Sequence, residues 1–304
     1  MFKVYIEKFN IKFQILSQLS SWNGFVCSKD LKDFWLNKTG GKLSSKESAV
    51  LRNLSLALRN GPSEIYDKII FSRDNEIISL RKNPKYKEIF KSFNLASMTL
   101  ENRILKIEKL YLPISKKLGQ KITKNNKIFS EASSQIFKFL DVRKKPKKLE
   151  LLMLLPKNKG YEAWNYYNRL ILIPPLKDSW DDIVKILFHE YIHIILFNNS
   201  KLKNDIQKTL KPYPKIFNKI LRETGLTKEI IAEEMFVSSL IPEGELSNLL
   251  FPKFKLWITS SKTDFLEKSR KNVAQAMKPY VVERYQNKIT IKDYLIKLEQ
   301  ILKN

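Results

Sequence analysis

The sequence predicts a mainly helical α+β protein. Apolar residues recur at helical spacing through much of the chain after residue 100. Two apolar runs of strand length, 149–155 and 169–173, interrupt this pattern and are bounded by prolines. With 304 residues, of which 43% are hydrophobic and 12% aromatic, the chain can bury a substantial core in one domain with a large extension, or in two.

Residues 1–100 are predicted to form a mainly helical N-terminal region without a recognisable chemical constellation. Its short alternating or helical patterns are broken by glycine and proline. These breaks lie at Gly24, Gly40, Gly41, Gly61, Pro62 and Pro84. We therefore predict a boundary near residue 100, with the candidate site in residues 101–304.

The second region begins with helices and continues into two strands. Residues 101–142 have helical spacing, with a break around 123–126. The strands predicted at 149–155 and 169–173 flank a segment rich in turn formers and aromatic residues. Further helices are predicted after Pro242, and the last of them has an amphipathic face within 289–302.

The most informative helix is predicted to run from about Trp180 to Phe197. Ser179 is a suitable N-cap with an acidic residue, Asp182, three positions later, and 198–200 supplies a stop. The helix is apolar nearly all round, which is typical of a buried central helix. Polar residues inside such a helix need partners.

This helix carries the only two histidines of the chain, His189 and His193, on either side of Glu190. The spacing places both imidazoles on one helix face, where they can hold one Zn²⁺ while the glutamate reaches a zinc-bound water. The alternative is that both histidines are ordinary packed side chains. The pattern resembles the active helix of zincin metallopeptidases. That resemblance implies one zinc ion per chain and hydrolysis of peptide bonds, with Glu190 as the general base.

A catalytic zinc site of this kind needs a third protein ligand and one open position. No third histidine exists and Cys27 lies far upstream, so we expect a carboxylate. Gly225 can end one helix and Thr227 can cap another, which predicts a helix over 227–237. Its acidic residues are the candidates. They are Glu229 first, with Glu233 and Glu234 as alternatives.

Residues 229–233, Glu-Ile-Ile-Ala-Glu, resemble the Glu-x-x-Ala-Asp/Glu element of gluzincins. In that element the first acid binds zinc and the second orients a zinc-binding histidine. Residues 240–242, Leu-Ile-Pro, also resemble the Leu-Met-Pro corner of the ImmA/IrrE-type metallopeptidases. The resemblance covers the two motif helices and their approach. It implies the metal ligands His189, His193 and Glu229 in a zincin-like catalytic domain.

The same resemblance implies a role for the strand before the active helix. In zincins this strand borders the cleft, so 169–173 is expected to be an edge strand to which an extended peptide can add. The aromatic residues between the two predicted strands either line substrate subsites or pack the end of the sheet. They are Trp164, Tyr166 and Tyr167.

A helper for the developing oxyanion is also expected in such a site. It is not a histidine, because both histidines are already used. The candidates in the downstream segment can equally be structural or solvated side chains. They are Tyr280, Arg284 and Tyr285.

The net charge of +25 suggests nucleic acid, anionic lipid or acidic protein partners. However, the lysines are spread along the whole chain, and the densest run, 143–148, reads as a solvated linker between a helix and a strand. The chain carries no recognisable nucleic-acid motif. A basic nucleic-acid-binding protein is therefore one alternative function. A non-catalytic or regulatory zincin-like protein is the other, and the intact Glu190 argues against it.

The composition also predicts the compartment. The single cysteine, Cys27, excludes an intramolecular disulfide, so nothing requires an oxidising environment. No uncharged apolar run is long enough to span a membrane, and the first residues lack a signal-peptide core. We expect a cytoplasmic protein without a membrane span that acts on a peptide or protein substrate.

Overall fold

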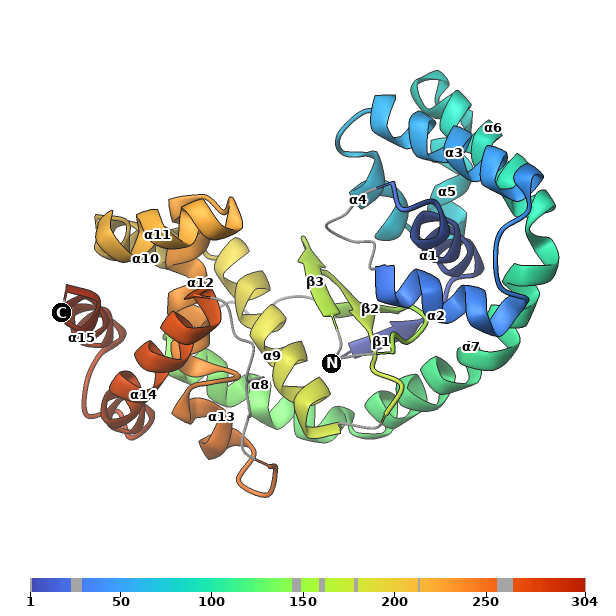
Figure 1. The fold of residues 1–304 in the computed structure, drawn as a ribbon. Coiled ribbons are helices and arrows are strands. Elements are labelled where there is room, and N and C mark those ends of the chain that lie inside the picture. Colours follow the sequence, from blue (N-terminus) through green and yellow to red (C-terminus); the bar gives the residue numbers. More distant parts are fainter. Residues whose placement is uncertain are drawn as a thin grey trace. The chain divides into compact units, whose positions relative to one another are not determined.

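The computed structural model describes residues 2–22, 29–143, 149–158, 162–177, 180–212, 214–255 and 265–303. Helices make up most of this part, together with one four-stranded mixed sheet (Figure 1). The predicted mainly helical α+β class is confirmed.

The chain folds into two compact units, each built from two stretches of sequence. The sheet unit holds Phe2–Asn125 and Leu149–Asp178, and the helical unit holds Asn126–Lys148 and Ser179–Asn304. The predicted boundary lay near residue 100, whereas the units part after residue 125. The reason is that α7 (Glu101–Lys124) packs against β1 (Phe2–Tyr5) and the early helices of the sheet unit.

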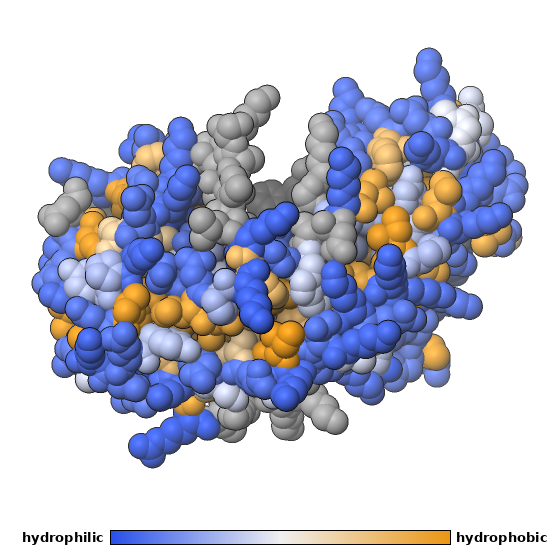
Figure 2. Space-filling view, turned by 90° about the horizontal axis from the view of Figure 1, so that it is seen from below, coloured by the Kyte–Doolittle hydropathy of each residue, from blue (hydrophilic) through white to orange (hydrophobic). Residues whose placement is uncertain are grey.

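Hydrophilic residues cover most of the face seen in Figure 2. Large hydrophobic side chains that stay exposed among the described residues come from many different elements, as is usual for a folded protein. Within the described part of the chain, every helix is too short or too polar to cross a lipid bilayer.

The sheet has the strand order β1-β2-β4-β3. The strands β1, β2 (Leu149–Met153) and β4 (Arg169–Ile173) run parallel, and β3 (Glu162–Tyr166) pairs antiparallel with β4. Both predicted strands are therefore present. The expectation that 169–173 is an edge strand is wrong. The turn at Tyr167 and Asn168 folds β3 back onto β4, so β3 forms the edge.

The aromatic residues around β3 have different environments. Trp164 and Tyr166 are partly buried and pack against the hydrophobic core of the sheet unit, where the Tyr166 ring lies 5.2 Å from that of Phe71. Tyr167, in the turn, is 57% exposed. For the first two residues the structure supports the packing alternative.

The helices and strands of the sheet unit pack around one hydrophobic core. Gln14 exchanges two hydrogen bonds with the backbone of Leu155, with distances of 3.0 and 2.8 Å, and so ties the first helix to the end of β2. Gly119 lets α7 approach the sheet, since a Cβ there would lie 3.1 Å from Val4 Cγ1 and 3.3 Å from Met153 Sδ. Besides α7, the helices are α1 (Lys8–Ser20), α2 (Lys29–Thr39), α3 (Ser45–Asn60), α4 (Ile65–Ile70), α5 (Asp74–Lys82), the 3₁₀ turn η1 (Pro84–Tyr86) and α6 (Lys87–Thr99).

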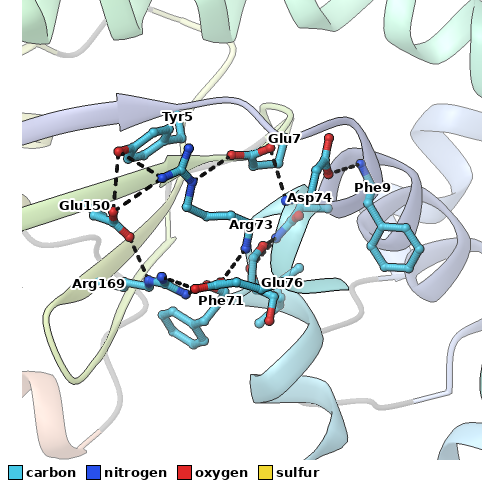
Figure 3. Close-up of polar contacts among 12 residues, drawn as sticks. Tyr5, Glu7, Phe9, Phe71, Arg73, Asp74, Glu76, Glu150 and Arg169 are labelled. Carbon is cyan, nitrogen blue, oxygen red and sulfur yellow. Dashed lines mark hydrogen bonds and ion pairs between the residues drawn. The ribbon is translucent and has the colours of Figure 1, made fainter. Parts of the chain in front are cut away.

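An ion cluster of Arg73, Arg169, Glu7, Glu76 and Glu150 joins the strands to α5 (Figure 3). Arg169 on β4 forms two 2.6 Å bonds to the Glu76 carboxylate and one of 2.8 Å to Glu150. Its guanidinium also donates to the Phe71 backbone carbonyl at 2.8 Å. Such a forked, charge-assisted contact fixes the strand against the helix in one geometry.

The second arginine of the ion cluster links segments that are far apart in sequence. Arg73 Nε donates to Glu7 Oε1 at 3.3 Å, and its guanidinium lies 4.0 Å from the centre of the Tyr5 ring. Arg73 Nη1 also lies 3.8 Å from Glu150 Oε1 on β2 (Figure 3). The two stretches of chain that make up the sheet unit are therefore held together by charge as well as by their core.

The helical unit packs around α9. Phe188 of α9 lies at ring-centroid distances of 5.7 Å from Phe129, 6.0 Å from Tyr191 and 5.3 Å from Phe251. The predicted helix break is present, because α7 ends at Lys124 and a new helix begins at Asn126. The helices are α8 (Asn126–Leu140), α9 (Trp180–Phe197), α10 (Ser200–Leu210), α11 (Pro214–Thr224), α12 (Lys228–Leu240), α13 (Glu245–Leu250), α14 (Phe265–Tyr285) and α15 (Ile291–Lys303).

Candidate metal centre

The helix α9 has the predicted bounds and the predicted buried setting. Its first turn carries two acidic residues, which the helix dipole favours, and its predicted N-cap Ser179 lies outside the described residues. Along most of its length the helix is apolar on every face. His189 is only 3% exposed and Glu190 only 9%, so these polar groups are held inside the helical unit.

A backbone carbonyl orients the His189 ring. Its Nδ1 lies 2.9 Å from the carbonyl oxygen of Ile241, just after α12. A carbonyl can only accept, so Nδ1 donates a proton to it and Nε2 is the ring nitrogen left to face a metal. That Nε2 lies 3.3 Å from Nε2 of His193. A metal-binding histidine is commonly oriented by such a bond to its second nitrogen.

The helix α12 supplies a carboxylate to the two imidazoles. It begins as predicted, with the Thr227 side chain accepting from the backbone N–H of Ile230. Glu234 Oε1 lies 3.2 Å from His193 Nε2, and Glu234 Oε2 lies 3.5 Å from His189 Nε2. Three side chains with metal-binding atoms thus converge in one place.

The donor atoms lie close enough together to share one metal ion. Zinc ligands at about 2.0–2.1 Å from the ion stand about 3.3–3.4 Å from one another in a tetrahedron. The two imidazole Nε2 atoms are 3.3 Å apart, and each lies within 3.5 Å of a different oxygen of the Glu234 carboxylate. One donor atom from each side chain can be chosen so that all three lie within 4.8 Å of one another, which lets the group hold a small metal ion.

The structure does not bring Glu229, the third ligand predicted from the sequence, to the two histidines. The Glu229 carboxylate pairs with Lys211 in a setting where its side chain is 40% exposed. Glu233, the first alternative, accepts from Lys203 at 2.8 Å and from Gln207 at 3.1 Å. Glu234 is the acid beside the histidines, because α12 packs with this face of the helix toward α9.

A sequence signal for Glu234 existed in its helical neighbours. Ile231, Val237 and Ser238 stand three or four positions away, are apolar or small, and are fully buried. They place Glu234 at the border of the buried face of α12. The first-turn acid Glu229 has a less buried setting.

The charges within the metal-free cluster are coupled. Burial is the largest single influence on the pKa of His193 and lowers it, but Glu234, Glu190 and Glu233 together raise it by more, so the net shift is upward. Burial raises the pKa of Glu234, yet the two imidazoles bring it well below its usual range. The lowered pKa favours the ionised carboxylate, which is the form that binds a metal.

Two further charged residues complete the cluster, and the sequence did not single them out. Arg270 of α14 lies 3.7 Å from Glu234 Oε2 and 3.2 Å from Glu243 Oε1. The Glu243 side chain is only 4% exposed and that of Arg270 only 16%. The carboxylates of Glu243, Glu234, Glu267 and Glu190 all act on the Arg270 guanidinium, so acidic groups outnumber it around the cluster. Such a surplus of carboxylates favours a bound cation.

The residues suggested for oxyanion stabilisation have other contacts. Arg284 is buried and donates to the backbone carbonyls of Phe139, Ile289 and Lys138, so it is a structural residue. Lys297 Nζ lies 5.6 Å from the centre of the Tyr280 ring. Tyr285, at the end of α14, is half-buried.

Comparison with known proteins gave no match. No family model, no curated protein and no solved structure is significantly similar to the chain.

Proposed function

We propose that this chain is a zinc-dependent metallopeptidase of the zincin type, with His189, His193 and Glu234 as metal ligands and Glu190 as general base. The observation that carries the proposal is the convergence of the His189, His193 and Glu234 side chains, whose metal-binding atoms lie within 4.8 Å of one another. The surplus of carboxylates around the one guanidinium of Arg270 is consistent with a bound cation.

The arrangement assigns each residue a task. A zinc ion at the three donors would polarise the substrate carbonyl and lower the pKa of water. Glu190, next to His189 on α9, takes the proton of the attacking water and passes it to the leaving amine. The Ile241 carbonyl accepts from His189 Nδ1 and so turns His189 Nε2 toward the metal position. The surrounding apolar side chains of α9 exclude bulk water from the base.

The choice of a peptide substrate rests on the resemblance of the His-Glu-x-x-His helix to zincins. A glutamate between two metal-binding histidines is the arrangement that activates water for attack on an amide. A purely structural zinc site closes its coordination with four protein ligands, whereas three converge here among the described residues.

The test combines metal analysis with a cleavage assay. We expect about one zinc per chain in protein purified without added metal, and cleavage of a peptide library that stops when the zinc is chelated. Glu190→Gln keeps the zinc but loses at least about 100-fold in cleavage rate, because it removes only the base. His193→Ala loses both.

Two results would contradict the proposal. Protein that binds no zinc even after zinc is added has no such site. Protein that binds zinc but cuts no peptide in the library, with or without Glu190→Gln, is better described as a regulatory or binding protein.

A further inference from the structure

We propose that Arg270 and Glu243 are positioning residues for the metal site, because they hold the Glu234 carboxylate in place through a chain of charged contacts. This inference rests on the proposed function, since it takes Glu234 as a metal ligand. It adds two residues to the site that do not touch the metal position.

Arg270 bridges two acidic residues, Glu243 and Glu234. Arg270 Nη2 lies 3.2 Å from Glu243 Oε1, and Arg270 Nη1 lies 3.7 Å from Glu234 Oε2. The other oxygen of Glu234, Oε1, is the one 3.2 Å from His193. The guanidinium thus lies beside the oxygen that faces His189, at 3.5 Å, and leaves the other oxygen to His193.

Burying the charged groups of Arg270 and Glu243 costs free energy, which indicates a role beyond stability. Glu243 is almost fully buried, and its Oε2 has no hydrogen-bond partner among the described residues. Arg270 Nε is also buried without a partner among the residues that the structure describes. A pair that served stability alone would be better satisfied, or would be replaced by apolar side chains at little cost.

A second arginine of α14 shows the contrast. Arg284 is buried as well, but its guanidinium donates to three backbone carbonyls. Arg270 instead has carboxylates as its ion-pair partners, and one of them belongs to the metal cluster. The two arginines therefore offer a matched pair, one at the site and one structural.

The short segment 241–243 supports two ligands at once. The Ile241 carbonyl orients His189, and Glu243, two residues later, anchors the arginine that contacts Glu234. Gly244 lets this segment fold back on the end of α12, because a Cβ there would lie only 2.0 Å from the Ser239 carbonyl oxygen. The end of α12 thus sets the positions of ligands on two helices.

Zinc affinity, measured by competition with a chelator, tests the inference without requiring turnover. Arg270→Gln and Glu243→Gln should each weaken zinc binding roughly 10- to 100-fold, the usual effect of losing a residue that orients a ligand. Arg270→Lys should restore part of the affinity, since it keeps the charge but not the fork. The absorption bands of the cobalt-substituted protein should change in Arg270→Gln.

A double-mutant cycle separates positioning from general structure. If Arg270 acts through Glu234, then Arg270→Gln should change zinc affinity little in the Glu234→Gln background. The control Arg284→Gln should lower the melting temperature and leave zinc affinity unchanged. The melting temperature of each zinc-free variant shows whether it is folded. If Arg270→Gln is unfolded, the near-isosteric Glu243→Gln replaces it in the cycle.

Several outcomes overturn the inference. The first is wild-type zinc affinity in both Arg270→Gln and Glu243→Gln. The second is an equal loss of zinc affinity when Arg270→Gln is introduced into the wild type and into Glu234→Gln. A wild-type protein that binds no zinc refutes the proposed function and this inference together. A wild-type protein that binds zinc without cutting peptides refutes only the peptidase function, and the affinities still decide the role of Arg270.

Discussion

Glu234 shows how one position on a helix decides a metal site. It stands one residue after Glu233 and five after Glu229, yet it alone of the three meets both histidines. A step of one residue turns a side chain by about 100° around the helix axis. Acids that look equivalent in sequence therefore have different partners: Lys211 for Glu229, Lys203 for Glu233 and the imidazoles for Glu234.

Substitution of Glu234 and of Glu229 allows a direct comparison of their effects on zinc affinity. Glu234→Gln is expected to weaken zinc binding by about 100-fold or more, because it removes one of three ligands. Glu229→Gln should leave zinc affinity within about twofold of wild type, since the Lys211 pair is partly exposed and worth little. Calorimetric titration with zinc measures both. Loss of zinc from Glu229→Gln, with Glu234→Gln unaffected, would restore the ligand set predicted from the sequence.

At the scale of elements, the ion cluster connects the two separate stretches of chain that make up the sheet unit. The strand β4 comes from the second stretch of chain in that unit, whereas α5 comes from the first. Arg169 connects them through Glu76 and the Phe71 carbonyl, and it reaches Glu150 on the neighbouring strand. The pKa of Glu76 is lowered chiefly by its hydrogen bond to Arg169.

Loss of Arg169 should destabilise the sheet unit. Arg169→Gln is expected to lower the free energy of unfolding by about 2 kcal/mol, since partly buried carboxylates lose a charged partner. The figure stays modest because these side chains keep some solvent contact. Urea denaturation measures it. Lys91→Gln is the control, since the exposed Lys91 pair with Glu88 should contribute less than about 0.5 kcal/mol.

The link between α3 and α7 should make stability depend on pH. Glu47 caps α3 together with Ser44 and binds Arg103 of α7 at 2.6 and 3.1 Å. Its pKa is lowered first by the hydrogen bond to Arg103. Because the folded pKa lies below the unfolded value of about 4.3, the contribution is present above that pH and is lost as pH falls through the folded pKa.

This pH dependence has a simple readout. The free energy of unfolding should be higher in wild type than in Glu47→Gln near pH 6, and the gap should narrow as the pH is lowered toward 3. Glu88→Gln, from an exposed pair, is expected to differ little from wild type throughout. A gap that stays constant from pH 6 to 3 would show that the Glu47 charge does not carry this contribution.

At the scale of the whole molecule, metal chemistry and bulk charge are separate features. The net charge of +25 is a property of lysines spread over the chain, whereas the metal cluster is locally acidic. The strands belong to the sheet unit, and the histidine helix belongs to the helical unit. The metal cluster is therefore best tested by point substitutions in the full chain.

Local patterns in the sequence predicted much of this architecture. The bounds of α9, the strand β4 and the break between α7 and α8 follow from spacing, caps and chain breakers over a few residues. The position of β4 within the sheet did not follow, since the pairing of β3 depends on the turn at Tyr167 and Asn168.

The sequence by itself determined that His189, Glu190 and His193 share one turn of a buried helix, because helical geometry is local and its period is constant. Only the tertiary structure decided that Glu234 faces these histidines and that Arg270 and Glu243 stand behind it. The physical reason is that the rotation of α12 toward α9 is set by side-chain packing against several other helices, α14 above all. The buried neighbours of Glu234 on α12 place it at the border of the buried face, but they do not show which side chains lie opposite.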